Sequence, residues 1–147
     1  MAKVLIVSAT RTGETLNIGN LIAEGIRISG HDANVVNANE IKKEEDLQGY
    51  DAYVFGSATY HGEMLQSMKS LLFLAEKASL ADKIGGAFGA FGWSGEAPDR
   101  VFETMQHIFK MKMVDSPLRL KSSALEGAIR AAQDYGKLIA AKLGAHP

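Results

Sequence analysis

Short apolar runs alternate with longer mixed stretches along the whole chain. The apolar runs predict five strands, at residues 3–7, 33–37, 52–56, 84–91 and 110–120. Pro117 interrupts the last run, because proline cannot donate a backbone hydrogen bond inside a sheet. Near-continuous apolarity in the first, third and fourth runs is typical of strands that are buried on both faces, as in parallel sheets.

Between the strands, apolar residues recur at the three- and four-residue spacing of amphipathic helices. The clearest of these segments span residues 18–26, 65–75, 101–109 and 125–139. Gly30 follows the first segment at a position typical of a helix C-terminal cap, whereas residues 39–50 are weakly periodic and predict a short or irregular helix. Repeated strand–helix alternation, with no internal repeat or linker, predicts a single doubly wound α/β domain over residues 1–147.

Composition is that of an ordinary soluble domain, with 46% apolar and 22% charged residues. Sixteen basic and seventeen acidic residues leave a formal charge of -1, so no basic surface for nucleic acid is predicted. No apolar run approaches the ~20 residues of a membrane span, and we expect no cleavable leader because a strand pattern begins at Lys3. With no cysteine, thiolate chemistry is excluded, and we expect a cytoplasmic protein.

Hydroxyl side chains crowd the end of the first predicted strand. Four of them fall within eight positions: Ser8, Thr10, Thr12 and Thr15. The segment leads into the amino terminus of a helix, where unpaired N–H groups and the helix dipole favour an anion. Gly13 lets the backbone curl closely, and Arg11 either adds a charged contact or points to solvent.

This first loop lacks the lysine of a nucleoside-triphosphate loop and the G-x-G-x-x-G fingerprint of a dinucleotide site. Hydroxyls and backbone amides therefore predict a site for a small phosphomonoester. The alternative is a helix cap rich in serine and threonine that binds no ligand.

The loops after the third and fourth predicted strands carry aromatic residues beside glycines. In "SATYHGE", Tyr60 can stack on a planar ring, and Gly62 permits close approach of the backbone. In "FGWSGE", Trp93 can form a second wall for such a ring. The alternatives are a surface turn with an exposed tyrosine and a solvated His61, and a tryptophan that packs on its own sheet.

These three loops resemble those of the flavodoxin family. "TRTGET" (residues 10–15) is similar to the family's phosphate loop [ST]-x-T-G-x-T, and "GSATYHG" (56–62) resembles its second flavin loop. "FGAFGWSGEA" (88–97) looks most like the third loop in the flavodoxin-like module of flavodiiron (A-type) proteins. The resemblance covers nearly the whole chain and is that of a short-chain member. It implies a five-stranded parallel sheet of order 2-1-3-4-5, flanked by helices, with the three loops around one crevice.

The resemblance also implies non-covalent FMN. It assigns cofactor contacts to Ser8, Thr10, Arg11, Thr12, Gly13, Glu14 and Thr15 in the first loop, to Ser57, Ala58, Thr59, Tyr60, His61 and Gly62 in the second, and to Phe91, Gly92, Trp93 and Gly95 in the third. In this assignment the first loop holds the phosphate, residues 57–59 approach the ribityl chain or the ring, and Tyr60 stacks on the isoalloxazine. Gly62 is the expected hinge of a peptide that reorients beside the flavin, and a nearby His61 would make the potential depend on pH.

Two functions fit this scaffold. The first is a small electron carrier that moves electrons between redox partner proteins, with no catalytic residue or metal of its own. The second is an NAD(P)H-dependent quinone or flavin reductase, which generally needs longer loops to position a substrate. A phosphoacceptor receiver domain is excluded, because Ser8-Ala9 and Gly56-Ser57 stand where that chemistry needs carboxylates. We expect no nucleic-acid partner, no membrane span, and a monomer or weak homo-oligomer.

Overall fold

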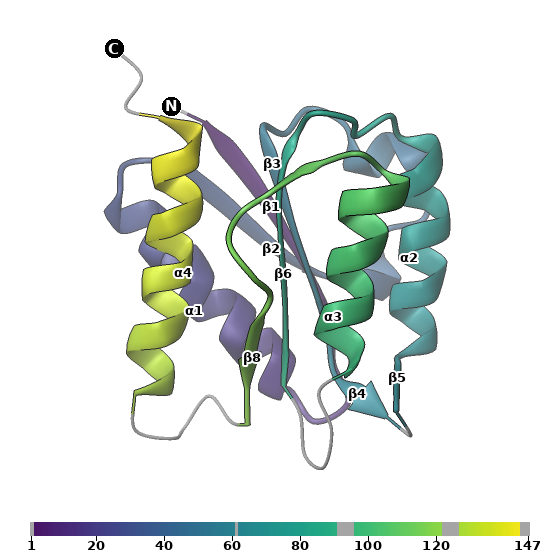
Figure 1. Cartoon of the computed structure of the whole chain (residues 1–147), viewed down its shortest axis with the longest axis horizontal. Coiled ribbons are helices and arrows are strands. Elements are labelled where there is room, and N and C mark those ends of the chain that lie inside the picture. Colours follow the sequence, from purple (N-terminus) through teal and green to yellow (C-terminus); the bar gives the residue numbers. More distant parts are fainter. Residues whose placement is uncertain (1, 61, 91–95, 122–126, 145–147) are drawn as a thin grey trace.

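Apolar segments form a parallel sheet in the computed structural model, which describes residues 2–60, 62–90, 96–121 and 127–144. The strands are β1 (Lys3–Ala9), β2 (Asp32–Asn37), β3 (Ala52–Ser57), β6 (Ile84–Ala90), β7 (Lys112–Met113) and β8 (Leu118–Leu120). Their order is β2-β1-β3-β6, and both β7 and β8 then pair with β6 (Figure 1). This arrangement confirms the predicted order 2-1-3-4-5, with the fifth strand divided into two short pieces.

The division of the fifth strand falls at Pro117, as the sequence predicts. β7 pairs with the start of β6 at Ile84 and Gly85, and β8 pairs with its end. Ala87 lies between these two pairings, and its backbone has no strand partner on the edge of β6 that faces β7 and β8 in the described structure. The hydroxyl of Tyr135 takes that place, because it accepts the Ala87 N–H at 3.1 Å and donates to the Ala87 carbonyl at 3.2 Å. A side chain thus completes the hydrogen bonding of a central strand.

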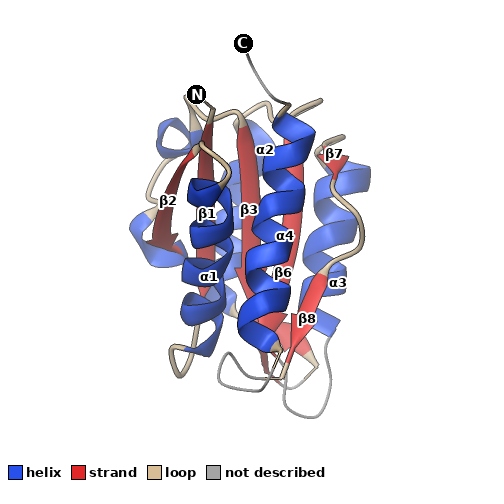
Figure 2. Ribbon diagram, turned by 90° about the vertical axis from the view of Figure 1, so that its left-hand side faces the viewer, coloured by secondary structure: helices blue, strands red, loops and turns tan. Residues whose placement is uncertain are grey.

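Helices cover both faces of the sheet (Figure 2). Helices α1 (Glu14–Ile28) and α4 (Ala128–Leu143) lie on one face, and α2 (Gln66–Lys77) and α3 (Glu96–Glu103) lie on the other. A π-helical turn, Thr104–Ile108, extends α3. The weakly periodic segment forms two 3-10 turns, Ala38–Glu40 and Glu44–Leu47, in place of a longer helix. The predicted helical position at residue 125 lies outside the described residues.

Side chains alternate between the two apolar layers along β1, which makes it a strand buried on both faces. Leu5 and Val7 face α2 and α3, whereas Val4 and Ile6 face α1 and α4. The first layer also contains Met105 and Phe109, so the apolar positions of the segment after the fourth strand serve mainly the core. Ile108 of the same segment is 59% exposed.

Helices α1 and α4 approach so closely that glycine is required at their crossing. A Cβ atom at Gly25 would lie 2.0 Å from the carbonyl oxygen of Gln133, and one at Gly136 would lie 2.1 Å from that of Ile22. The two backbones therefore touch at this crossing. The short connection from Ala9 to Glu14 places the amino terminus of α1 beside the carboxyl end of β1.

A small hairpin that the sequence did not predict extends from β3. It consists of β4 (Thr59–Tyr60) and β5 (Glu63–Met64), which pair in antiparallel fashion. Gly62 lies in its turn with φ at +76°, a conformation that favours glycine. Because β1, β3 and β6 run parallel, the hairpin and the loop after β1 lie at the same end of the sheet, the lower end in Figure 1. Among the described residues, no helix is both long and apolar enough to cross a membrane.

Candidate functional site

The first loop makes a sharp turn between β1 and α1. Gly13 has φ at +92° and immediately precedes the first residue of the helix. Its N–H donates to Thr10 Oγ1 at 2.9 Å, and its carbonyl accepts the Asn17 N–H at 2.9 Å. Thr10 retains its own hydroxyl proton, so it can still donate to a ligand. Arg11 and Thr12 are exposed at the outside of the turn.

Two buried hydroxyls lie under this loop without a protein partner. Ser8 and Thr15 are both 0% exposed, and neither hydroxyl oxygen has a hydrogen-bond partner among the described residues. A buried polar group in this condition typically costs about 1–3 kcal/mol. Thr15 belongs to the first turn of α1, where the helix dipole and the amide groups favour an anion. These residues therefore fit a ligand with a phosphate group.

The Ser8 hydroxyl lies against α1 at a different position from Thr15. A Cβ atom at Gly19 would lie 2.8 Å from Ser8 Oγ, so the Ser8 hydroxyl faces α1 at the position of Gly19. Gly19 follows Thr15 by four residues, which is about one helical turn. The sequence motif did not distinguish these two hydroxyls, and the structure places Ser8 about one helical turn further along α1.

The second loop uses its own hydroxyls to hold its shape. Ser57 is buried, donates to the Ala58 carbonyl at 2.9 Å and accepts the Leu65 N–H at 3.0 Å. Thr59 Oγ1 accepts the Ala97 N–H at 3.1 Å, which joins the hairpin to the start of α3. Sequence reasoning missed these positioning roles, because the contacts with Leu65 and Ala97 join residues that no local pattern links.

Backbone contacts bring the first and second loops together. The Ala58 N–H donates to the carbonyl of Ala9, the last residue of β1, at 3.0 Å. Strand β6 is equally close, since a Cβ atom at Gly89 would lie 2.2 Å from the Ser57 carbonyl oxygen. The carboxyl ends of β1, β3 and β6 thus form one continuous edge.

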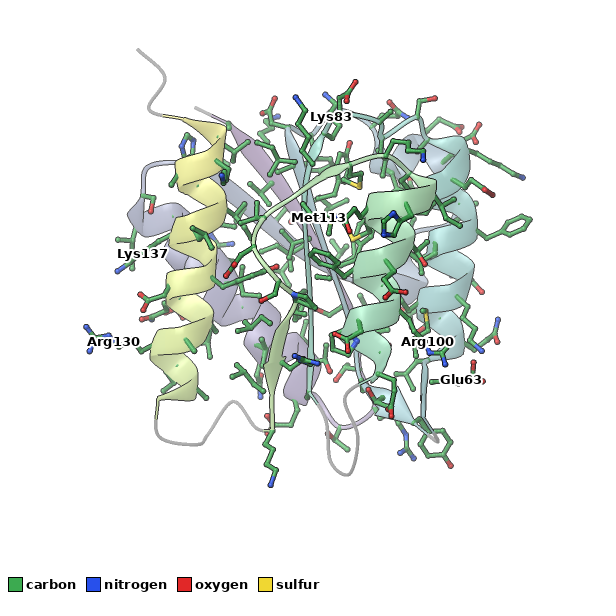
Figure 3. All side chains as sticks on the ribbon, in the orientation of Figure 1. Glu63, Lys83, Arg100, Met113, Arg130 and Lys137 are labelled. Carbon is green, nitrogen blue, oxygen red and sulfur yellow. The ribbon has the colours of Figure 1, made fainter. Side chains whose placement is uncertain are left out.

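Arg11 and Tyr60 meet above this edge. The Arg11 guanidinium carbon lies 3.8 Å from the centroid of the Tyr60 ring, whose residue is 43% exposed. The sequence predicted either a phosphate contact or a solvated Arg11, and this ring contact was not anticipated. Glu63, on the opposite strand of the hairpin, pairs with Lys69 at 3.2 Å. Figure 3 shows Glu63 and Arg100 at this end of the molecule and Lys83 at the opposite end.

Part of the predicted site lies outside the described residues, namely His61, Phe91, Gly92, Trp93 and Gly95. Their assignments remain predictions. The described residues on either side of the third loop are Ala90, which ends β6, and Glu96, which begins α3. Within the described part of the chain, no group of three or more histidine or acidic side chains is arranged to hold a metal.

A separate groove of about 510 Å³ lies at the opposite end of the sheet, between the starts of β1 and β2. Its polar lining residues are largely engaged within the protein. Arg27 donates to the Ala33 carbonyl at 2.7 Å, and Asn34 donates to the Tyr50 hydroxyl at 3.3 Å. Among its described lining residues, the groove has no fully buried hydroxyl without a partner of the kind found at Ser8 and Thr15.

Comparison with known proteins identifies the class of this fold and site. The family model for flavodoxin matches residues 6–135, and the chain belongs to the flavodoxin family. The flavodoxin of Clostridium beijerinckii is 29% identical over 136 residues, which cover 92% of this chain and 97% of that protein. The solved structure of a flavodoxin from the domain Archaea superposes with a TM-score of 0.91 at 28% identity, covering 97% of this chain and 99% of that one.

Two further relatives are of other kinds. The putative diflavin flavoprotein A 2 of Thermosynechococcus vestitus is 30% identical over 102 residues, which are 67% of this chain and 18% of that protein. This chain therefore spans less than a fifth of that relative. The NAD(P)H dehydrogenase (quinone) of Archaeoglobus fulgidus is 27% identical over 122 residues, 67% of this chain and 64% of that protein. Membership of the flavodoxin family makes FMN the cofactor, as the loop motifs predicted.

Proposed function

We propose that this chain carries electrons between redox partner proteins by means of non-covalently bound FMN. The observation that carries the proposal is the Thr15 hydroxyl at the amino terminus of α1, which is fully buried and has no hydrogen-bond partner in the part of the chain that the structure describes. Such a group is costly without a partner and becomes favourable when it donates a hydrogen bond to a phosphate oxygen. Family membership supplies the identity of the phosphate compound.

The first loop would hold the phosphate. Thr10, Thr12 and Thr15 supply hydroxyl donors, and the backbone of residues 11–14 supplies amides around the glycine turn. Arg11 belongs to the same turn, and its guanidinium lies over the Tyr60 ring. The site thus relies on neutral donors close to the phosphate.

The second loop would hold the ring. Ser57 and Thr59 fix the hairpin through their own hydrogen bonds, so that Tyr60 is presented at its outer end. Its exposed ring can stack on a flat cofactor. Gly62 has the left-handed conformation that suits a peptide able to change orientation. FMN, when bound, supplies reversible one- and two-electron transfer, and the protein sets its potential through these surroundings.

A second function is favoured by one observation, the similarity to a quinone dehydrogenase from Archaeoglobus fulgidus. In that case this chain would oxidise NADH or NADPH and reduce a quinone at the same flavin. The connections after β1 and β3 are short in the described structure, which favours a carrier that exposes its cofactor to a protein partner. The cytoplasmic location and the monomeric or weakly oligomeric state stay predictions.

Two assays separate these functions. The protein reconstituted with FMN is first mixed with NADH or NADPH and a benzoquinone, and the absorbance of the nicotinamide is followed. A carrier gives no turnover above free FMN. The protein is then added to an NADPH-dependent flavoprotein reductase and cytochrome c, where a carrier increases cytochrome reduction in proportion to its concentration. Quinone turnover without this relay would contradict the carrier function.

A further inference from the structure

The contact between Arg11 and Tyr60 joins two loops that are far apart in sequence. The guanidinium carbon of Arg11 lies 3.8 Å from the centroid of the tyrosine ring, well within the range of a cation–π interaction. Arg11 belongs to the turn between β1 and α1, and Tyr60 belongs to β4 of the hairpin after β3. The contact therefore links the loop proposed for the phosphate with the residue proposed for the ring.

The backbone on both sides of this contact is held in place. The turn that carries Arg11 is closed by the hydrogen bond from the Gly13 N–H to Thr10 Oγ1. The segment that carries Tyr60 is attached to the end of β1 through Ala58, and to α3 through Thr59. With both backbones tied to neighbouring elements, the guanidinium packs on one face of the tyrosine ring.

We propose that Arg11 positions Tyr60 so that one face of its ring is ready to stack on the isoalloxazine. An aromatic ring has two faces, and Arg11 covers one of them. The proposal rests on the proposed FMN site and goes beyond it, because it gives Arg11 a role through Tyr60 that is independent of the phosphate. Without Arg11, the Tyr60 ring loses this contact and more of its ordering falls to the binding step, which weakens binding by about two- to tenfold.

The test compares FMN with riboflavin, which has the same ring system but no phosphate. Dissociation constants for both are measured by quenching of flavin fluorescence with the wild type, Arg11→Ala, Tyr60→Leu and the double variant. Arg130→Ala is the matched control, because it removes one exposed positive charge from α4, away from both loops (Figure 3). Nuclear magnetic resonance of the ligand-free protein records the Arg11 side-chain protons, which the Tyr60 ring current shifts upfield.

We expect Arg11→Ala to weaken FMN and riboflavin by the same factor, about two- to tenfold, and to have no further effect in the Tyr60→Leu background. Arg130→Ala leaves both constants unchanged, and the upfield shift disappears in Tyr60→Leu. A loss confined to FMN would overturn the proposal, because Arg11 would then act on the phosphate. Tighter binding by Arg11→Ala would also overturn it, since Arg11 would then cover the face that the ligand needs.

The outcomes also separate this proposal from the proposed function. If the wild type bound neither flavin, the FMN site itself would be wrong, and the resonance shift would still show whether Arg11 orients Tyr60. If the wild type bound FMN and the Arg11→Ala effect persisted in the Tyr60→Leu background, the FMN site would stand and the positioning role would be refuted.

Discussion

Buried hydroxyl groups are hydrogen-bonded in one region of this protein, and in another they have no partner among the described residues. In the body of the sheet, the Tyr135 hydroxyl makes two hydrogen bonds with the backbone of Ala87, and the Tyr53 hydroxyl donates to the Leu47 carbonyl. At the carboxyl end of β1, the hydroxyls of Ser8 and Thr15 are buried to the same degree or more and have no partner among the described residues. The same chemical group is therefore satisfied by the fold in one region and left without a described partner in the other, where we expect Thr15 to bind the ligand.

This difference separates groups that stabilise the fold from groups that serve binding. Removing a satisfied buried hydroxyl leaves its backbone partners unpaired, so the free energy of unfolding falls. Removing an unpartnered one relieves an unfavourable burial, so the free energy of unfolding rises while ligand affinity falls. The following substitutions test each side of the comparison.

Thr15→Val has the largest expected effect on binding. Valine has nearly the same shape and no hydroxyl, so we expect FMN affinity to fall about 10- to 100-fold, as for a lost hydrogen bond to a charged group. The free energy of unfolding of the ligand-free protein should rise by about 1 kcal/mol. Fluorescence titration and urea unfolding measure the two quantities.

Thr15→Ser is the matched control, because it keeps the hydroxyl and should retain most of the FMN affinity. If Thr15→Val instead lowered the free energy of unfolding and left FMN affinity unchanged, the Thr15 hydroxyl would stabilise the fold and would not bind the cofactor.

Tyr135→Phe should produce the opposite pair of results. It removes the hydroxyl that replaces a strand partner at Ala87, and we expect the free energy of unfolding to fall by about 2 kcal/mol. FMN affinity should stay within about twofold of the wild type, because α4 contributes no predicted ligand contact. A loss of FMN affinity as large as that of Thr15→Val would remove the distinction between the two regions.

The same tyrosine predicts a dependence of stability on pH. Burial raises the pKa of Tyr135 to about 12, from an ordinary value near 10. The neutral hydroxyl is therefore favoured in the folded state, and its contribution is fully present below pH 10. Between pH 10 and about 12 the unfolded chain loses this proton first, so the wild type loses about 1.4 kcal/mol of stability per pH unit relative to Tyr135→Phe.

Urea unfolding of the wild type and of Tyr135→Phe from pH 8 to pH 11.5 tests whether the wild type loses stability relative to the variant as the pH rises. Parallel curves across the whole range would show that the Tyr135 hydroxyl does not titrate differently in the folded and unfolded states. Tyr53, whose pKa burial also raises, is present in both proteins and cancels in the difference.

Ser8→Ala should have the smallest effect. Because this hydroxyl faces Gly19 and lies about one helical turn below Thr15, its removal should change FMN affinity by less than about threefold. The free energy of unfolding should rise by less than about 1 kcal/mol. A loss of FMN affinity equal to that of Thr15→Val would place Ser8 among the direct phosphate ligands.

Much of the fold was predictable because hydrophobic periodicity repeats along the chain. Apolar runs located the strands, and Pro117 located the break in the fifth strand. The hydrogen bonds of Tyr135 to Ala87 were not predictable, because they join residues 48 positions apart and depend on how α4 lies on the sheet. The hairpin at Thr59–Met64 was also missed, since two-residue strands are too short to show a period.

The candidate site was likewise predictable from the sequence only in part. The motif from Thr10 to Thr15 has fixed spacing, and it predicted a loop that the structure places at the start of α1. The positioning role of Ser57 and the contact of Arg11 with Tyr60 are tertiary features without a sequence signal. Which predicted residues touch FMN is a question for binding measurements.

The most direct test of the central claim is the ratio of two dissociation constants, for riboflavin and for FMN, measured with the wild-type protein under the same conditions. If the buried threonine hydroxyl and the start of α1 recognise a phosphate, FMN binds at least about 100-fold more tightly than riboflavin, and inorganic phosphate weakens only the binding of FMN. Equal constants for the two flavins would contradict the claim, because the phosphate would then contribute nothing.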